Sequence, residues 1–516
     1  MNIFPYNNIQ ILKDNFSMCF DKCGAFDIDK FKEILSKNEV CFSRESYGMD
    51  WLGKGYARLR ATDALQTVIQ EDVEWNKDKN TENILIRGDN LEALKHLSNA
   101  YNNKIKMIYI DPPYNTGNDG FVYNDKKKYN KEDLIKLTGM DEDKAKRVLS
   151  FLDKKSNSHS AWMTFMYPRL YTARQLLKND GVIFISIDDN EATQLKILMD
   201  MIFGETNFVG QIIWNSNLKG RQISKNDISR TKEYILCYAK NKDNICNMEI
   251  KVDDAKRIMP SAYKGFDYDT EEDENGSYVI KNKLYNTNSN FNEQTRPNLV
   301  YDIYYNPADE SVSFSYVKDY YKISAPYIKG TTSRYAWRWS KDKVIKDIKD
   351  LLFIKNKSGE YDIYTKVRDY QSTNLKDIIT NVDGSASARE IQMLFGEKVF
   401  EHAKPLSLIN ILISVSTSAD DIILDFFAGS GTTGDAVMRL NKQDGGNRRY
   451  ILIQLPEVID DKKNNIAYNF IKNTLGIDTP KVSDITKERL IRAADMIGDT
   501  SSFKCFDVID TRAEIA

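Results

Sequence analysis

The stretch Ile422-Ile423-Leu424-Asp425-Phe426-Phe427-Ala428-Gly429-Ser430-Gly431-Thr432-Thr433 decides the fold of this chain. Its apolar start predicts a buried strand, its two glycines predict a tight turn, and Asp435 to Leu440 continue as a helix-like run. A strand, a glycine turn and a helix N-terminus in this order make the nucleotide-type pocket of α/β proteins. We therefore expect a parallel sheet with a ligand pocket at the carboxyl ends of its strands.

A second segment, Asp111-Pro112-Pro113-Tyr114, follows the apolar run Ile105 to Ile110. Its aspartate is expected where a buried strand ends and a loop opens onto a crevice. The carboxylate of Asp111 and the carbonyl of Pro112 are acceptors that suit the hydrogens of an amino group. Consecutive prolines stiffen the turn and remove competing N–H donors. Tyr114 adds an aromatic face on which an unpaired base could stack.

Together, these segments resemble the N6-adenine DNA methyltransferases in which the DPPY segment precedes the cofactor segment (the beta group). The resemblance is closest to the modification (Mod) subunits of type III restriction-modification systems, and it covers roughly residues 45 to 500. Further segments share it in the same order: Ile84 to Leu97, Asn115 to Asp125, Trp162 to Leu177, Gly181 to Glu191, Arg296 to Leu299 and Tyr450 to Glu457. A match of several motifs is far more specific than one pattern alone.

The resemblance implies transfer of a methyl group from S-adenosylmethionine to adenine N6 in a specific double-stranded DNA sequence, by base flipping and direct displacement without a metal. It assigns the catalytic role to Asp111, Pro112, Pro113 and Tyr114. The implied cofactor-binding residues are Lys404, Pro405, Asp425, Phe427, Gly429, Gly431, Thr432, Thr433, Gln454 and Glu457. Implied partners are double-stranded DNA, a second copy of the chain and a restriction (helicase-nuclease) subunit.

The chain departs from the family in two places. Many relatives carry an acidic residue at the end of the second cofactor strand, where this chain has Gln454, with Glu457 three residues later. Either side chain could bind the ribose hydroxyls. The sequence also ends at Ala516, where type III modification subunits usually continue into another domain.

The α/β pattern predicts a doubly wound, Rossmann-like methyltransferase sheet that is split by an inserted, mixed α+β target-recognition domain. The expected parts are an N-terminal region (1–80), a catalytic part (81–215), the insertion (216–390), a cofactor-binding part (391–500) and a short C-terminal tail (501–516). The insertion is rich in Tyr, Asn and Lys and has weak periodicity. Its recognition sequence follows no residue-to-base code that could be read.

Within the insertion, Arg334-Tyr335-Ala336-Trp337-Arg338-Trp339 interleaves cations with aromatic residues. This pattern makes Arg334, Arg338 and Trp337 candidates for DNA binding by phosphate contact and stacking. The tryptophans could equally be core residues. The formal net charge of −2 over 516 residues is unusual for a DNA-binding protein, although this segment is locally basic.

Composition limits the remaining classes. A hydrophobic content of 41% is enough for sizeable cores, and neither a long apolar run nor a signal-peptide core occurs, so a cytoplasmic protein without membrane contact is expected. With scattered cysteines and three histidines, no metal site is expected.

Alternatives remain open. Gly429 to Gly434 also fits the dinucleotide fingerprint G-x-G-x-x-G, but an NAD enzyme would leave the DPPY segment without a role. Cytosine-N4 methylation uses the same logic, although it more often has Ser before the Pro-Pro pair. A non-catalytic DNA-recognition subunit, as a truncated product, is a further possibility. Asp188 to Glu191 could face the pocket, but Asp188 and Glu191 have the spacing of a helix capping box, which we favour. Trp162 lies at a core-facing position of a helix, so packing is favoured over substrate contact.

Overall fold

The computed structural model describes residues 49–117, 129–153, 157–217, 220, 228–264 and 267–511, with isolated positions 16, 19, 20, 26 and 31. Most of the predicted extension from Asn115 to Asp125, namely residues 118–125, lies outside the described residues, as do residues 512–516. The chain divides into two compact units, one formed by Met1–Met248 with Leu375–Ala516 and the other by Glu249–Asn374.

Ten strands of the described chain form one mixed sheet in the first unit, in the order β1-β19-β2-β18-β17-β3-β4-β6-β5-β16. Pairing is parallel from β19 to β4 and antiparallel between β1 and β19, β4 and β6, and β6 and β5. The strands are β1 (Thr67–Glu71), β2 (Ile84–Arg87), β3 (Ile105–Ile110), β4 (Leu177–Ile187), β5 (Phe208–Trp214), β6 (Glu233–Ala239), β16 (Ile378–Ile379), β17 (Ile422–Asp425), β18 (Arg449–Gln454) and β19 (Lys504–Asp510).

The two segments singled out in the sequence meet in the middle of this sheet. β17 pairs with β3 in parallel, with Ile423 opposite Met107 and Leu424 opposite Ile108. From this pair the chain proceeds in opposite directions, because β3 is followed by β4 on one side and β17 by β18 on the other. Such a reversal leaves a crevice at the carboxyl ends of the two strands, which is where α/β proteins bind ligands.

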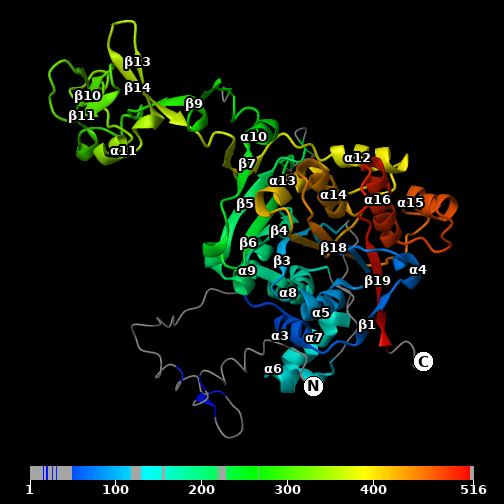
Figure 1. The fold of residues 1–516 in the computed structure, drawn as a ribbon. Coiled ribbons are helices and arrows are strands. Elements are labelled where there is room, and N and C mark those ends of the chain that lie inside the picture. The colour runs from blue at the N-terminus through cyan, green and yellow to red at the C-terminus, as the bar shows by residue number, and fades with distance from the viewer. Residues whose placement is uncertain are drawn as a thin grey trace. The chain divides into compact units, whose positions relative to one another are not determined.

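Helices cover both faces of the sheet. α3, α5, α8 and α9 pack against one another, and α13, α14 and α16 form a second group, with β3, β4 and β18 between them in Figure 1. The predicted doubly wound α/β sheet is therefore confirmed. The helices of this unit are α3 (Lys54–Thr62), α4 (Val73–Asn76), α5 (Asn90–Tyr101), α6 (Lys131–Thr138), α7 (Glu142–Asp153), α8 (His159–Leu176), α9 (Ala192–Phe203), α12 (Ala386–Phe395), α13 (Leu406–Ser416), α14 (Thr432–Asp444), α15 (Asn465–Asn469) and α16 (Val482–Ile497).

The expected N-terminal region and C-terminal tail are both partly built into this unit. β19, from the expected tail, lies inside the sheet between β1 and β2, and β1 comes from the expected N-terminal region. Arg87 on β2 donates hydrogen bonds of 2.8 and 2.7 Å to Asp507 on β19. The prediction of a tail over 501–516 is therefore wrong for Lys504–Asp510, because a short strand that pairs only with distant segments has no local sequence signal.

The second unit, Glu249–Asn374, spans fewer residues than the insertion predicted at 216–390. Its strands are β7 (Glu249–Lys251), β8 (Thr270–Asp273), β9 (Gly276–Lys283), β10 (Ile303–Asn306), β11 (Ser311–Ser313), β12 (Tyr321–Ile323), β13 (Leu351–Lys355), β14 (Tyr361–Val367) and β15 (Ser372–Asn374), and its helices are α10 (Val252–Ile258) and α11 (Lys341–Lys346). β6 and β16, which lie within the predicted insertion, belong to the large sheet. The second unit has an aromatic-rich core that includes Tyr301, Tyr305 and Trp337.

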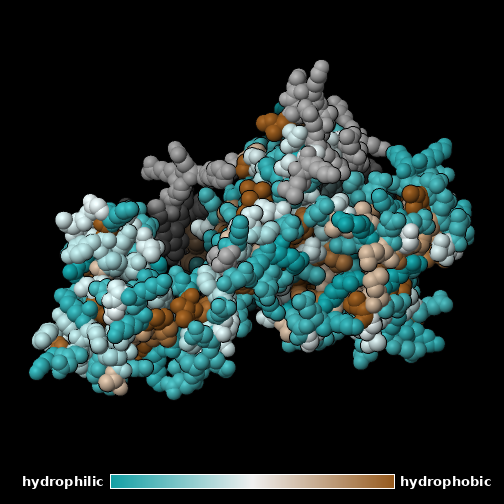
Figure 2. Space-filling model, turned by 90° about the horizontal axis from the view of Figure 1, so that it is seen from above, coloured by the Kyte–Doolittle hydropathy of each residue, from teal (hydrophilic) through white to brown (hydrophobic). Residues whose placement is uncertain are grey.

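On the face shown in Figure 2, hydrophilic residues predominate and hydrophobic residues form separate small patches. Across the described part of the chain, no helix combines the length and the apolar character needed to cross a membrane.

A buried ion pair fixes the glycine turn to α16. Arg489 on α16 and Asp435 on α14 have side chains with 0% exposure, and the guanidinium Nη2 lies 3.1 Å from the carboxylate Oδ2. Arg489 also donates hydrogen bonds to the hydroxyls of Ser430 (2.9 Å) and Thr432 (2.8 Å). The cation therefore holds the turn and the first turn of the following helix in one arrangement.

We expect Arg489→Met to destabilise the first unit by about 3–5 kcal/mol, because the buried Asp435 carboxylate loses its fully buried cation and keeps only the partly exposed Arg439, 2.6 Å from Oδ1. The drop in melting temperature, measured by calorimetry, should be largely recovered in Arg489→Met with Asp435→Asn. Lys472→Met, which changes an exposed cation, is the control for charge. Equal melting temperatures for Arg489→Met and Lys472→Met would contradict a structural role for the buried pair.

Candidate active site

The predicted catalytic and cofactor segments lie side by side at the carboxyl edge of the sheet. Asp111 directly follows β3, and Asp425 is the last residue of the neighbouring strand β17. The two carboxylates are close enough for the charge of Asp111 to raise the pKa of Asp425. The structure thus brings together two segments that are far apart in the sequence.

Asp111 forms an ion pair with Lys404. The Lys404 ammonium Nζ donates a hydrogen bond of 2.8 Å to Oδ2 of Asp111. The other oxygen, Oδ1, is buried and has no hydrogen-bond partner among the described residues. Burial raises the pKa of Asp111, while Lys404 opposes this by favouring the carboxylate. The pair therefore leaves one desolvated acceptor open at the strand end.

Lys404 is itself held by two carboxylates. It comes just before α13, and its Nζ lies 3.3 Å from Oε2 of Glu233 as well as 2.8 Å from Asp111. Burial would lower the pKa of Lys404, but the charges of Asp111 and Glu233 outweigh burial and raise it. Lys404 is thus a cation in contact with the catalytic segment. Pro405 is buried and caps the start of α13.

The Tyr114 hydroxyl donates a hydrogen bond of 2.9 Å to Oε2 of Glu233. Burial raises the pKa of Tyr114 well above its usual value, and the charges of Asp111 and Glu233 add to this shift, so the phenol stays protonated and acts as a donor. The ring of Tyr114 is partly exposed, and the Lys404 ammonium lies 5.0 Å from its centre. The aromatic face is therefore fixed at its hydroxyl end.

The rest of the DPPY loop is held by α8 and by the residue before α9. Trp162 on α8 is fully buried and donates a hydrogen bond of 2.7 Å to the carbonyl of Pro113, so it packs as predicted and also anchors the loop. Asn115, at φ 58°, donates to the buried carboxylate of Glu191 at 2.6 Å. No described residue donates to the carbonyl of Pro112.

Glu191 does not complete a capping box with Asp188. The Asp188 carboxylate accepts hydrogen bonds from the backbone and side chain of Asn190, and Glu191 binds Asn115 and His159 instead. The Nδ1 atom of His159 lies 2.8 Å from Oε1 of Glu191. The capping prediction was wrong because the contact with the DPPY loop comes from a distant segment that local spacing does not reveal.

The glycine turn is shaped mostly by its own side chains. Gly431 has φ 88°, a left-handed conformation that favours glycine, and a Cβ there would lie 3.3 Å from Thr486 on α16. Thr432 and Thr433 are buried, and Thr433 donates a hydrogen bond of 2.6 Å to Oδ2 of Asp425. Asp425 also accepts from the backbone N–H of Phe427 at 2.9 Å. The threonine hydroxyls therefore stabilise the turn from within.

Gln454 and Glu457 occupy different environments after β18. The Gln454 side-chain oxygen accepts a hydrogen bond of 2.7 Å from the backbone N–H of Gly429, and its amide nitrogen donates to the carbonyl of Leu455 at 3.2 Å. Glu457 is exposed, and no described residue donates a hydrogen bond to its carboxylate. Gln454 fixes the glycine turn, while the carboxylate of Glu457 is open to a ligand.

The candidate DNA-binding residues of the second unit differ in exposure. Trp337 is 3% exposed and donates a hydrogen bond of 2.7 Å to the carbonyl of Tyr301, so it is a core residue and cannot stack on a base. Alternating aromatic and basic residues do not reveal which face of the segment is buried. Arg334 forms an ion pair of 3.0 Å with Asp302, whereas Arg338 is exposed.

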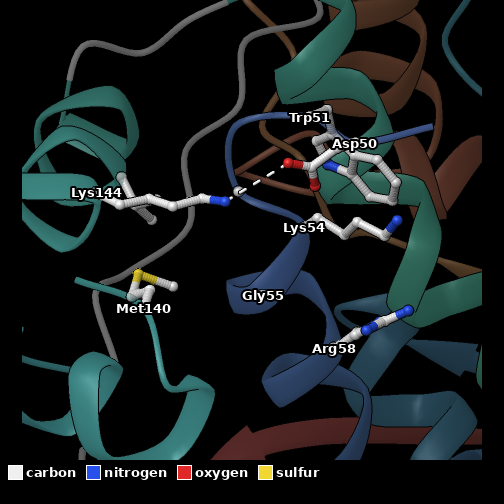
Figure 3. A pocket seen from close by; sticks show the side chains of 9 residues that line it. Asp50, Trp51, Lys54, Gly55, Arg58, Met140 and Lys144 are labelled. Carbon is white, nitrogen blue, oxygen red and sulfur yellow. Dashed lines mark ion pairs between the residues drawn. The ribbon is translucent and has the colours of Figure 1, made fainter.

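The first unit also has a small basic pocket that the sequence did not predict. It lies between the start of α3 and α7 and is lined by Lys54, Arg58 and Lys144 together with Asp50. Figure 3 shows Lys144 reaching across the pocket toward Asp50, with an ion-pair distance of 3.5 Å. The pocket has more cations than carboxylates, but it shares no residue with the site at β3 and β17.

Two contacts of the site had no signal in the sequence, whereas Glu191 lies in the recognised segment Gly181 to Glu191 and was assigned to a helix cap. Glu233 lies at the start of an antiparallel strand, and Arg489 lies on a helix near the end of the chain. Both resemble ordinary surface charges in the sequence. Only the burial of Arg489 and the pairing of β6 with β4 bring these side chains to the site.

Comparison with known proteins gives a family match across most of the chain. A family described as DNA methylase matches residues 105–479. The Mod subunit of the type III restriction-modification enzyme EcoPI from Escherichia phage P1 is 41% identical over 98% of this chain and 77% of its own length. The EcoP15I Mod subunit from Escherichia coli is 39% identical over 98% of this chain and 78% of its length. The solved structure of a putative DNA modification methylase from Thermus thermophilus matches with a TM-score of 0.33, 12% identity and coverage of 83% of this chain and 98% of that one.

The buried carboxyl of Asp425 generates a prediction about pH. Burial raises its pKa to about 7, far above the value in an unfolded chain. The folded protein therefore binds an extra proton between roughly pH 4 and pH 7, and its stability falls as the pH rises through this interval. Because asparagine cannot ionise, Asp425→Asn avoids this loss of up to about 4 kcal/mol.

We expect the melting temperature of Asp425→Asn minus that of the wild type to be clearly larger at pH 8 than at pH 5. Differential scanning calorimetry at both pH values measures this difference. Asp420→Asn, an exposed aspartate before the same strand, should show no such change. A pH-independent difference for Asp425→Asn would contradict a raised pKa at this carboxyl.

Proposed function

The chain belongs to the DNA methylase family and to the modification subunits of type III restriction-modification enzymes, and from this premise we propose that it methylates adenine N6 in double-stranded DNA. The family predicted from the sequence is thereby confirmed. The observation that carries the proposal is the open, buried oxygen Oδ1 of Asp111 at the end of β3.

The acceptor fits an exocyclic amino group. Such a nitrogen is a poor nucleophile because its lone pair is delocalised into the ring, so an enzyme must hold its hydrogens while the nitrogen attacks. Oδ1 of Asp111 and the carbonyl of Pro112 are acceptors that receive no hydrogen bond from a described residue. The partly exposed ring of Tyr114 offers a stacking surface for the flipped base. Fixed acceptors stabilise the transition state because they need no reorganisation.

S-adenosylmethionine supplies the electrophilic methyl group in this proposal. The backbone of the turn from Gly429 to Gly431 would face it. At Gly431 the left-handed φ favours glycine, and a Cβ would lie in tight contact with Thr486 on α16. We assign the ribose hydroxyls to the open carboxylate of Glu457 and a structural role to Gln454. Lys404, expected beside the methionine end of the cofactor, is in contact with Asp111 and is assigned to that carboxylate as well.

For the second unit, Glu249–Asn374, we propose the role of a target-recognition domain. Support comes from its position as an insertion between two halves of one sheet and from exposed cations such as Arg338. A separate unit beside a catalytic scaffold can vary its surface without altering the chemistry.

Cytosine-N4 methylation is the second candidate, because the same acceptors would hold the amino group of cytosine. The aspartate at the first position of the DPPY segment favours adenine. Mass spectrometry of nucleosides from DNA methylated by the purified chain separates N6-methyladenine from N4-methylcytosine. Sequencing of DNA from cells with and without this gene, by a method sensitive to modified bases, would give the recognition sequence.

Subunit partners follow from the same family membership. We propose that the chain pairs with a second copy and with a restriction subunit. Light scattering after size-exclusion chromatography gives the mass of the chain alone and after mixing with the restriction subunit of a type III system. A methylation assay on the isolated chain separates an active enzyme from a non-catalytic recognition subunit.

Asp111→Ala should reduce methyl transfer by a factor of roughly 100 or more while S-adenosylmethionine and DNA still bind, because it removes an acceptor used mainly in the transition state. Single-turnover methylation measures the rate, and calorimetry measures cofactor affinity. Asp243→Ala, at an exposed carboxylate of the same unit, should keep the wild-type rate. A near wild-type rate for Asp111→Ala would refute the assignment.

Arg338→Ala should weaken DNA binding without changing cofactor affinity. If the guanidinium contacts a phosphate, affinity falls for every sequence and the salt slope decreases by about one. If it reads a base, cognate DNA alone loses about 1–3 kcal/mol. Arg338→Lys keeps the charge and serves as the matched control, since it preserves a phosphate contact better than bidentate base recognition. Unchanged DNA affinity and salt slope in Arg338→Ala would exclude this residue from the recognition surface.

A further inference from the structure

Glu233 is a charged residue at the catalytic edge that belongs to none of the segments recognised in the sequence. It is the first residue of β6, the antiparallel strand next to β4, where it pairs with Trp214 on β5. Its side chain is 23% exposed. Antiparallel pairing brings the start of β6 to the same edge as the carboxyl ends of β3 and β4, and this is why Glu233 reaches the DPPY loop.

Both hydrogen-bonding contacts of Glu233 are made by residues of the proposed site. Oε2 accepts from the Tyr114 hydroxyl at 2.9 Å and lies 3.3 Å from the Lys404 ammonium. Asp111 is the other carboxylate beside these same two donors. Two carboxylates therefore share two donors. The Tyr114 hydroxyl donates to Glu233, and the Lys404 ammonium lies closer to Asp111 than to Glu233.

This division determines whether Asp111 has a free oxygen. Lys404 occupies Oδ2, and Oδ1 has no partner among the residues that the structure describes. If the Tyr114 hydroxyl were released from Glu233, the Asp111 carboxylate, which already interacts with the phenol, would remain as an acceptor for it. A buried phenol hydroxyl is expected to donate to an acceptor, because leaving a buried polar group without a hydrogen bond costs free energy. Oδ1 would then be blocked for the substrate.

We infer that Glu233 is a positioning residue of the methylation reaction, which holds the Tyr114 hydroxyl and shares Lys404 so that Oδ1 of Asp111 stays open for the amino group of the target base. This inference rests on the proposed function. Glu233 itself need not touch the substrate, because it acts through Tyr114 and Lys404.

The inference predicts an unusual pattern in a double-mutant cycle. Glu233→Ala should slow single-turnover methylation by roughly 10- to 100-fold, the effect typical of a lost hydrogen bond to a charged group. Tyr114→Phe keeps the ring and should lose less than Glu233→Ala. The double variant should be faster than Glu233→Ala alone, because without the hydroxyl nothing competes for Oδ1. If the hydrogen bond between Tyr114 and Glu233 only held the loop, the double variant would be no faster than Glu233→Ala, because both substitutions break the same contact.

The conservative variant Glu233→Gln supplies a second measurement. Its amide oxygen still accepts from Tyr114, so the rate should be closer to wild type than that of Glu233→Ala. The charge of Glu233 raises the pKa of the Asp111 carboxyl, so removing that charge in Glu233→Gln should lower this pKa. The acidic limb of the pH–rate profile should therefore move to lower pH in Glu233→Gln.

Glu205→Ala is the matched control, since this carboxylate is exposed between α9 and β5 and makes no contact with the site. Calorimetric binding of S-adenosylmethionine reports whether each variant is folded. If Glu233→Ala does not fold, the pH profile of Glu233→Gln decides alone. With an active wild-type chain, a double variant no faster than Glu233→Ala, or an acidic limb that does not shift in Glu233→Gln, would overturn the inference. Absence of methylation by the wild-type chain would overturn the proposed function first.

Discussion

The parallel pairing of β17 with β3 is the constraint on which the site depends. Hydrogen bonds between these strands fix Leu424 opposite Ile108, so the next residues on each strand emerge at the same edge. Since the chain leaves the pair in opposite directions, this edge is where a sheet of this topology is expected to bind a ligand. Strand pairing alone brings the two halves of the site together, whatever their separation in the sequence. A unit as large as the second one can therefore be inserted between them.

Around this crevice, charge and hydrogen bonding decide which groups are available to a ligand. At the glycine turn, Gln454, Thr433 and Arg489 occupy most polar groups from within, and at the DPPY loop, Trp162 and Glu233 hold the backbone and the phenol. The protein thereby satisfies the groups that shape the site and leaves few acceptors open. Holding these groups in fixed orientations lowers the stability of the fold, as the buried carboxyl of Asp425 illustrates.

The sequence predicted the elements that have strong local signals. The strand, turn and helix around Gly429 and Gly431, the strand before Asp111 and the helix carrying Trp162 all lie where the patterns placed them, within a few residues. Residues that act through tertiary contact were not predictable in this way. Glu233 reaches Tyr114 only through strand pairing, and the aromatic pattern around Trp337 could not reveal that the indole faces a core.

The position of β19 inside the sheet has a consequence for how the protein is made. Arg87 on β2 finds its partner Asp507 on β19 only after 420 further residues have been synthesised. At typical translation rates this takes on the order of 20–80 s, and for most of that time both edges of β2 lack their neighbours, because β18 begins only at Arg449. Exposed strand edges invite pairing with other chains. The nascent first unit therefore passes through a long aggregation-prone interval on the ribosome, and chaperone supply during synthesis should govern how much active protein a cell obtains.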